Sequence, residues 1–172
     1  MAIEMESMAI EMPRVEGHPN RVGFRGVLTL VDEASDKPPA GARGHRVILT
    51  RVAAEAALPS LMGMGVDYAP SLDRHDTRRK VGVITQAEIV GKHLELSGYL
   101  YGKDFPELIR EMKSSGLSAQ AGQALGMSYE ISDARILDMK ARIWTLAKVT
   151  FTGAAILRRE KAAYRKTWIE LE

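Results

Sequence analysis

Ser128 and His75 are two residues of this 172-residue chain whose side chains could together perform nucleophilic catalysis. Ser128 lies in the sequence GMSYEIS, and His75 lies in the charged sequence LDRHDTR, between Asp73 and Asp76. A serine hydroxyl is a poor nucleophile until a base takes its proton, and a histidine can be that base. Acidic neighbours favour the protonated imidazole and can orient the ring. The pair therefore predicts acyl-transfer chemistry, on condition that the fold brings the two side chains together.

Each residue also has an ordinary explanation. A strand serine commonly faces solvent, and a GxS sequence by itself is a weak signal of function. Ser128 has chemical meaning only if His75 reaches it. The other three histidines, His18, His45 and His93, lie near the start of the chain or begin predicted strands, where a surface position is expected.

An adjacent basic pair, Arg158 and Arg159, follows an apolar run. These charges could simply end a strand in solvent. They could also form an oxyanion site, in which a backbone N–H group and an ordered guanidinium stabilise the charge that develops on a carbonyl oxygen. Both interpretations remain open from the sequence.

The composition argues against several other kinds of site. The chain has no cysteine and no HExxH sequence, so we expect no metal site. The glycine-containing sequences at 63–65 and 122–126 lack the context and the lysine of phosphate-binding loops, so we expect no cofactor. The net charge is +2 and the basic residues are spread along the chain, which indicates no nucleic-acid partner.

The sequence also predicts a soluble protein with one domain. No apolar run approaches the roughly 20 residues that a membrane helix needs, and the start shows no basic segment followed by an apolar one, so we expect neither a membrane span nor a secretory signal. The first 20 residues contain MAIEM twice and then several prolines and glycines. They predict a flexible tail ahead of a single domain at 21–172.

Alternating apolar residues predict a fold made mainly of strands. Residues 63–80 are rich in Gly, Pro, Asp and Arg and predict one long loop, which carries His75. The expected fold class is α+β and mainly β, a small antiparallel β-barrel surrounded by two or three helices. Strands are expected at 21–31, 45–50, 81–90, 93–101, 126–132 and 141–157, and helices at 52–62, 104–114 and near 158–164, while 167–171 closes the chain without an assigned element.

Several segments in this order resemble the prohead maturation proteases of tailed phages and prophages, a family that shares its fold and mechanism with the herpesvirus assemblins. The resemblance covers roughly residues 22–165 and rests on the order and spacing of its motifs. These motifs are SLDRHD at 71–76, VGVITQAEIVGKHLELSGYLY at 81–101, LGMSYEISD at 125–133 and KVTFTGAAILRR at 148–159.

The resemblance implies a role for each candidate residue. His75 matches the family's general base, and Ser128 matches its nucleophile. The third member of the triad belongs on the strand after the serine, within 148–152 here. Phage enzymes often carry glutamate there and herpesvirus enzymes histidine, whereas this chain offers Thr150 or, as the alternative, Lys148. The spacing to the arginine pair at 158–159, which would match the oxyanion arginines, favours Thr150.

This departure leaves three interpretations open. The enzyme could use a Ser–His dyad with Thr150 as a weak orienting group. An acid could come from elsewhere, with Asp76, Glu130 and Asp138 as candidates. The third interpretation is a degenerate enzyme.

The implied function is a serine endopeptidase of capsid maturation. Its substrates would be the capsid scaffold or the N-terminal segment of the major capsid protein, and the protease itself. We expect self-association, as a dimer or a higher oligomer, and action inside assembling proheads in the host cytoplasm. The alternatives are a catalytically weak or inactive capsid assembly protein with the protease fold, and a β-barrel binding module unrelated to phages.

Overall fold

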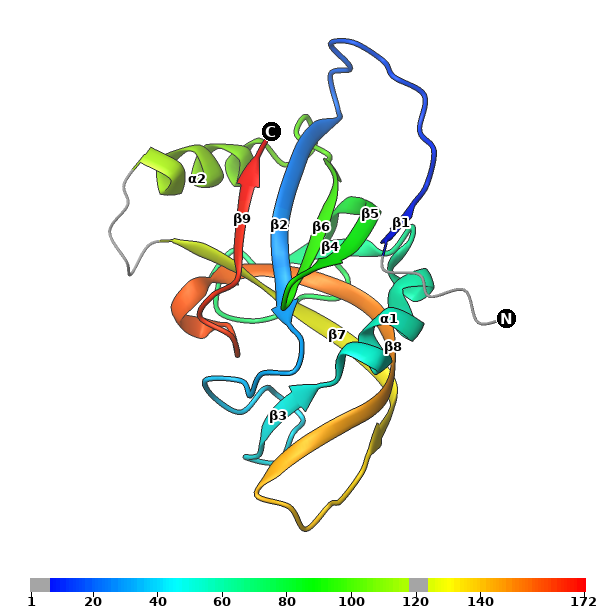
Figure 1. Cartoon of the computed structure of the whole chain (residues 1–172). Coiled ribbons are helices and arrows are strands. Elements are labelled where there is room, and N and C mark those ends of the chain that lie inside the picture. The colour runs from blue at the N-terminus through cyan, green and yellow to red at the C-terminus, as the bar shows by residue number, and fades with distance from the viewer. Residues whose placement is uncertain (1–6, 118–123) are drawn as a thin grey trace.

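The computed structural model describes residues 7–117 and 124–172, which form nine strands, two α-helices and a short 3-10 helix (Figure 1). The elements in chain order are β1 (Ser7–Ala9), β2 (Val22–Leu30), β3 (Arg46–Leu49), α1 (Arg51–Leu61), β4 (Gly65–Tyr68), β5 (Lys80–Val90), β6 (His93–Leu100), α2 (Pro106–Leu117), β7 (Leu125–Ile136), β8 (Ile143–Arg158), η1 (Arg159–Lys161) and β9 (Trp168–Leu171).

All nine strands belong to one curved sheet, with the order β3-β8-β4-β5-β6-β2-β9. Strand β7 pairs with β8 outside this path, and β1 pairs with β5. The structure thus confirms the mainly β, α+β class with α-helices packed outside the sheet. The sheet is a half-barrel, and among the described strands β3, β7 and β9 each pair with a single neighbour.

The expectation of a purely antiparallel sheet needs one correction. Strands β3 and β4 both run parallel to β8, at Arg46↔Ile143 and at Val66↔Ala154. Helix α1 connects them and spans the stretch of β8 that lies between their two pairing sites. β3 and β4 therefore follow each other along one edge of β8, while β7 occupies the other edge.

Helix α1 closes the space between β3 and β4 on this edge. Thr50 caps it by accepting a hydrogen bond from the backbone N–H of Ala53 at 3.1 Å. Its buried face consists of alanines and two leucines, Leu58 and Leu61, which are fully buried. Ser60 Oγ accepts the backbone N–H of Phe151 at 2.9 Å. This bond satisfies a β8 donor where neither β3 nor β4 is paired with β8.

Strand β4 is an element that the sequence did not reveal. It lies inside the segment 63–80 that was expected to be a loop, and it pairs with β8 on one side and β5 on the other. A four-residue strand that contains Gly65 and Asp67 has neither the length nor the alternation that marks a strand in a sequence. The loop that carries His75 is therefore shorter, at residues 69–79.

Part of the predicted tail is also held to the sheet. Strand β1 pairs with β5 at Met8↔Ala87, and the N–H of Ile10 donates to the carbonyl of Thr85 at 2.7 Å. Met8 packs against the core, and this apolar contact gives the short strand a reason to dock. Residues 1–6 of that segment lie outside the described residues.

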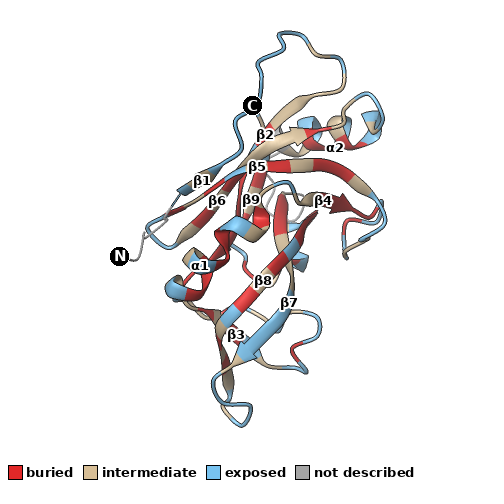
Figure 2. Ribbon diagram, turned by 90° about the vertical axis from the view of Figure 1, so that its right-hand side faces the viewer, coloured by how far each residue is buried: buried red, intermediate tan, exposed pale blue. Residues whose placement is uncertain are grey.

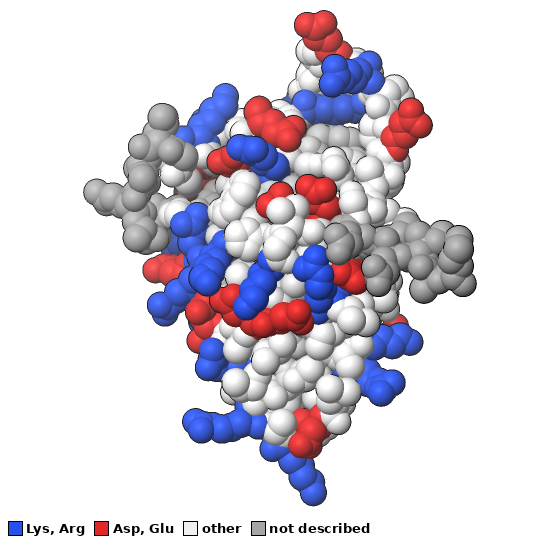
Figure 3. Space-filling model, viewed as in Figure 1, with Lys and Arg blue, Asp and Glu red and all other residues white. Residues whose placement is uncertain are grey.

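The core fills the concave side of the sheet and the space under α1 (Figure 2). Phe24, Leu28, Leu58 and Phe151 are among its largest fully buried side chains. On the face shown in Figure 3, Lys and Arg alternate with Asp and Glu, so this surface has no stripe of one charge. Among the described residues, neither helix has the length and hydropathy that crossing a membrane requires.

A substitution in α1 tests how much this helix contributes to the sheet. Leu58→Ala removes a fully buried side chain and should lower the free energy of unfolding by about 2–5 kcal/mol, because it leaves a cavity against β8. Val52→Ala is the control, since Val52 lies on the same helix and is 75% exposed; it should change stability by less than about 0.5 kcal/mol. Urea unfolding followed by tryptophan fluorescence gives both values. Equal losses would contradict the packing of α1 described here.

Candidate active site

Three adjacent strands bring the polar residues of the site into one row. Ala155 of β8 pairs with Ser128 of β7 on one side and with Asp67 of β4 on the other. Directly paired residues of neighbouring strands point to the same face of a sheet. Glu130 lies two positions after Ser128, opposite Gly153, so its side chain points the same way. Asp67, Ser128 and Glu130 thus share one face around two small residues of β8.

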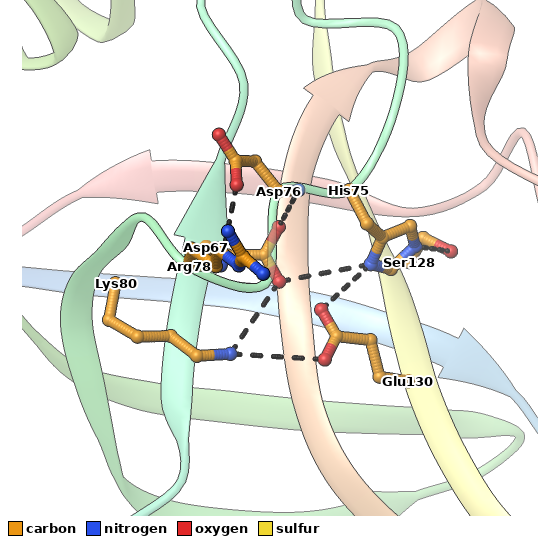
Figure 4. A network of polar contacts seen from close by, with 7 residues as sticks. All are labelled: Asp67, His75, Asp76, Arg78, Lys80, Ser128 and Glu130. Carbon is orange, nitrogen blue, oxygen red and sulfur yellow. Dashed lines mark hydrogen bonds and ion pairs between the residues drawn. The ribbon is translucent and has the colours of Figure 1, made fainter.

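His75 joins this row from the loop between β4 and β5 (Figure 4). Its Nε2 lies 3.1 Å from Ser128 Oγ. Its Nδ1 lies 2.9 Å from Glu130 Oε1 and 3.8 Å from Asp67 Oδ2. One ring nitrogen therefore meets a hydroxyl and the other meets carboxylates, which is the geometry of a nucleophile, a base and an acid that orients the base.

The loop at 69–79 is fixed at both sides of the histidine. The backbone N–H of Asp76 donates to Asp67 Oδ1 at 2.8 Å, so a fully buried carboxylate on β4 anchors the residue next to His75. Earlier in the loop, the carbonyl of Leu72 accepts the N–H of Arg158 at 2.7 Å, and the Leu72 side chain is buried. These contacts hold the imidazole in place although His75 does not lie in a strand.

Glycines make room for the carboxylates and for a lysine. A Cβ atom at Gly153 would lie 2.8 Å from Glu130 Oε2, so the glutamate occupies the space that a side chain at 153 would need. A Cβ atom at Gly65 would lie 2.6 Å from Cδ of Lys80. Lys80, the first residue of β5, crosses Gly65 and places its Nζ 3.8 Å from Glu130 Oε2 and 3.9 Å from Asp67 Oδ2.

The charges of this cluster shift the protonation of its members. Burial disfavours the charged ring of His75, but hydrogen bonding and attraction from Asp67 and Glu130 outweigh burial and raise its pKa to about 9. Burial also disfavours the charged form of Asp67, yet its contacts with His75, Glu130 and the Asp76 N–H lower the pKa of this carboxyl below its ordinary value. At neutral pH the resting imidazole therefore carries a proton on each nitrogen.

The structure brings His75 and Ser128 together, but it does not bring Thr150 or Lys148 to them. Thr150 pairs with Ser132, and both Thr150 and Lys148 line a groove beside α1. Among the described residues no hydrogen bond joins either of them to His75. The single proton of Nδ1 has Glu130 as its partner, so Glu130 replaces Thr150 as the candidate third member.

The two remaining acids considered from the sequence are engaged in their own turns. The Asp76 carboxylate accepts the backbone N–H of Arg78 at 3.3 Å, and the Asp138 carboxylate accepts the backbone N–H of Lys140 at 2.9 Å. Of the three acids, Glu130 is the one that meets the ring, and the sequence offered a signal for it. Two residues on the same strand at spacing two point to one face, and Glu130 has this relation to Ser128. Asp67 and Lys80 were missed, since Asp67 lies in the unrecognised strand β4.

The predicted oxyanion donors are arranged differently from the expectation. The backbone N–H of Arg158 donates to Leu72, and that of Arg159 donates to the carbonyl of Ala124 at 2.8 Å. Both amides are therefore occupied. Of the two side chains, that of Arg158 is exposed, whereas the Nε of Arg159 is buried and has no hydrogen-bond partner among the described residues. Its backbone lies close to β7, because a Cβ atom at Gly126 would come within 3.1 Å of Arg159 Cα.

Asp67, His75 and Glu130 also satisfy the minimum distances for a metal site, with one potential ligand atom of each within 4.8 Å of the others. The sequence gave no sign of this carboxylate–histidine cluster, because its members come from three separate segments. Lys80 and the protonated imidazole already supply two positive charges against the two carboxylates. The cluster is therefore balanced without a cation, and its geometry fits proton transfer better.

A cleft of about 480 Å³ opens beside the hydroxyl of Ser128. It runs along β7 towards the β7–β8 turn, and residues 39–42 form one of its walls. Its lining is mainly apolar, with Val47, Ile136, Trp144 and Leu146 among the contributing side chains. An apolar cleft next to a nucleophile can bind a substrate and exclude water from the reacting atoms.

Comparisons with known proteins give similarity among solved structures but none among sequences. No protein-family model matches the sequence, and no curated protein matches it. Among solved structures, KSHV protease in complex with a hexapeptide phosphonate inhibitor is similar, with a TM-score of 0.46 and 13% sequence identity. The match covers 79% of this chain and 59% of that chain, so this chain matches less than two thirds of the length of that protease.

The raised pKa of His75 predicts a pH-dependent contribution to stability. Since its pKa is about 9 in the folded protein and 6.5 ordinarily, the folded state holds the proton more tightly. The stabilisation is complete below pH 6.5 and disappears as the pH rises to about 9. Free energies of unfolding, measured in urea across this range, should differ between the wild type and His75→Gln by an amount that shrinks with rising pH. A difference that stays constant with pH would contradict the ion-paired imidazole.

Proposed function

We propose that the chain is a serine endopeptidase in which Ser128 is the nucleophile, His75 the general base and Glu130 the acid that orients it. The observation that carries the proposal is the continuous contact from hydroxyl to imidazole to carboxylate, at 3.1 Å and 2.9 Å. The proposed triad draws Ser128 and Glu130 from the same strand, so only the His75 loop has to be positioned against it.

The reaction would begin with the neutral imidazole. Nε2 of His75 takes the proton of Ser128 Oγ as that oxygen attacks a peptide carbonyl, and a new C–O bond forms. The imidazolium is stabilised by Glu130 and Asp67 and then gives the proton to the leaving amine as the C–N bond breaks. Water, activated by the same ring, releases the acyl group and restores Ser128. The Arg159 side chain is the proposed donor towards the oxyanion.

The proposed biological role is the maturation of phage proheads, and its support is the order of sequence motifs from 71–76 to 148–159. Substrates would be scaffold or the N-terminal segment of the major capsid protein, together with the protease's own chain. The apolar cleft beside Ser128 suits a polypeptide substrate. Self-association and action within the assembling prohead belong to the same proposal.

Covalent labelling with a fluorophosphonate tests the nucleophile. The wild-type protein should be labelled, and Ser128→Ala should abolish labelling, because the probe needs an activated hydroxyl. Ser132→Ala is the matched control on the same strand and should be labelled at the wild-type rate. Mass spectrometry of the labelled peptide identifies the modified residue. A folded wild-type protein that is never labelled, even at high concentration, would instead support a capsid assembly protein with the fold alone.

The third member is tested by the rate of the same labelling. Glu130→Gln should slow it by at least about tenfold, because the amide no longer stabilises the imidazolium. Thr150→Val should leave the rate within about twofold, because Thr150 lies beside α1 and not beside the ring. If Thr150→Val were as slow as Glu130→Gln, the assignment of the acid would be wrong.

The proposed base also predicts a pH–rate profile. Only the neutral form of His75 can accept the serine proton, and its pKa is about 9. The second-order labelling rate should therefore rise about tenfold for each pH unit above neutrality and level off near pH 9. Rates corrected for hydrolysis of the probe provide the profile. A plateau that begins below pH 7 would show that a different group is the base.

A further inference from the structure

Lys80 is the one charged side chain of the cluster for which the reaction described above has no role. Its Nζ lies 3.8 Å from Glu130 Oε2 and 3.9 Å from Asp67 Oδ2, so it bridges the two carboxylates that face His75 (Figure 4). It does so on the side away from Ser128, since the imidazole separates these carboxylates from the hydroxyl. Lys80 therefore does not touch the reacting atoms.

The position of this ammonium is fixed by the sheet. Lys80 begins β5, directly after the His75 loop, and pairs with Asp67 across the β4–β5 ladder. The absence of a side chain at Gly65 lets the lysine methylenes lie close against β4. The side chain is 38% exposed, so its charge remains hydrated while the carboxylates it meets are largely buried.

Three of the four strands around the imidazole contribute a charged side chain. β4 supplies the Asp67 carboxylate, β7 supplies Glu130, and β5 supplies Lys80. β8 presents only Gly153 and Ala155. Within the loop, the Asp76 carboxylate accepts the Arg78 N–H and lies 3.8 Å from the Arg79 guanidinium; Arg74 precedes the ring.

When the His75 ring is neutral, the carboxylates of Asp67 and Glu130 and the ammonium of Lys80 give the cluster one net negative charge. Transfer of the Ser128 proton to the ring makes the cluster neutral. Without Lys80 the same ring would face two unopposed carboxylates. These would hold the proton of the imidazolium more firmly and would also repel each other across less than 4.8 Å. The neutral base would then be scarcer at every pH below its pKa.

We infer that Lys80 is a positioning residue that bridges Asp67 and Glu130, holds both carboxylates against the imidazole and keeps them from trapping its proton. This inference rests on the proposed function for its catalytic consequence, but its electrostatic part concerns the resting protein. Lys80 is then a counter-ion that the two carboxylates share, so that Glu130 can orient the imidazole of His75 without keeping it permanently in its charged form.

Two substitutions separate the charge of Lys80 from its shape. Lys80→Met keeps an unbranched stem over Gly65 and removes the charge, whereas Lys80→Arg keeps the charge. The matched control is Lys92→Met, because Lys92 Nζ also lies 3.9 Å from a glutamate, Glu33, but belongs to the β5–β6 turn. Thermal unfolding of all three full-length variants establishes that they fold.

The first measurement is the NMR titration of the His75 ring in the resting protein, assigned by comparison with His75→Gln. The midpoint should rise by at least about half a pH unit in Lys80→Met. It should stay close to the wild-type midpoint in Lys80→Arg and in Lys92→Met. An unchanged or lowered midpoint in folded Lys80→Met would overturn the inference, whether or not the protein hydrolyses any peptide.

The second measurement is the fluorophosphonate labelling rate against pH. Lys80→Met should label roughly threefold or more slowly at neutral pH, which is the rate equivalent of half a pH unit, and should recover at high pH. Lys80→Arg should restore the neutral rate. A loss of equal size at all pH values would indicate a merely structural role and would contradict the inference. If the His75 midpoint rises in Lys80→Met alone, as predicted, but none of the proteins is ever labelled, the proposed function fails while the charge-balancing role of Lys80 stands.

Discussion

One imidazole held from both sides is the interaction on which the rest of the site depends. His75 meets the hydroxyl of Ser128 through Nε2 and the carboxylate of Glu130 through Nδ1. A ring on an eleven-residue loop has many orientations available, and fixing it costs conformational entropy. Asp67 offsets part of this cost by accepting the N–H of the next residue, Asp76, from a fully buried position. The base is thereby positioned by the sheet, although it does not belong to a strand.

The sheet can do this because its central strand carries almost no side-chain volume beneath the site. Gly153 and Ala155 of β8 lie between the acid of β4 and the two polar residues of β7. A larger residue at 153 would collide with the Glu130 carboxylate, which occupies that space instead. The segment 148–152, where the family resemblance placed the third group, ends one position before this glycine. The carboxylate that meets the ring comes instead from the neighbouring strand β7, which also carries Ser128.

The sequence carried enough information for the long strands, the two α-helices and the central pair, but not for the short strands β1 and β4. His75 and Ser128 stand out because a charged loop and a GxS strand are recognisable locally, and the long strands alternate clearly. Glu130 was recognisable only as one of several acids, because spacing along β7 shows a shared face but not which acid reaches the ring. Asp67 lay beyond reach, since β4 is four residues long and its burial comes from β5 and β8, which are distant in sequence. The geometry of Arg158 and Arg159 was also beyond reach, because their N–H groups bond to carbonyls that only the folded chain brings near.

The path from β3 through α1 to β4 has a consequence for when the proposed site can form. Asp67 reaches the site only when β4 is paired with both β5 and β8, and β4 and β8 lie far apart in the chain, at 65–68 and 143–158. The contacts of His75 with Ser128 and Glu130 span 53 and 55 positions, so they form late, after the entropy of closing long loops has been overcome. An incompletely folded chain therefore holds a serine without a base. The proposed catalytic pair thus exists only once β4, β7 and β8 are paired.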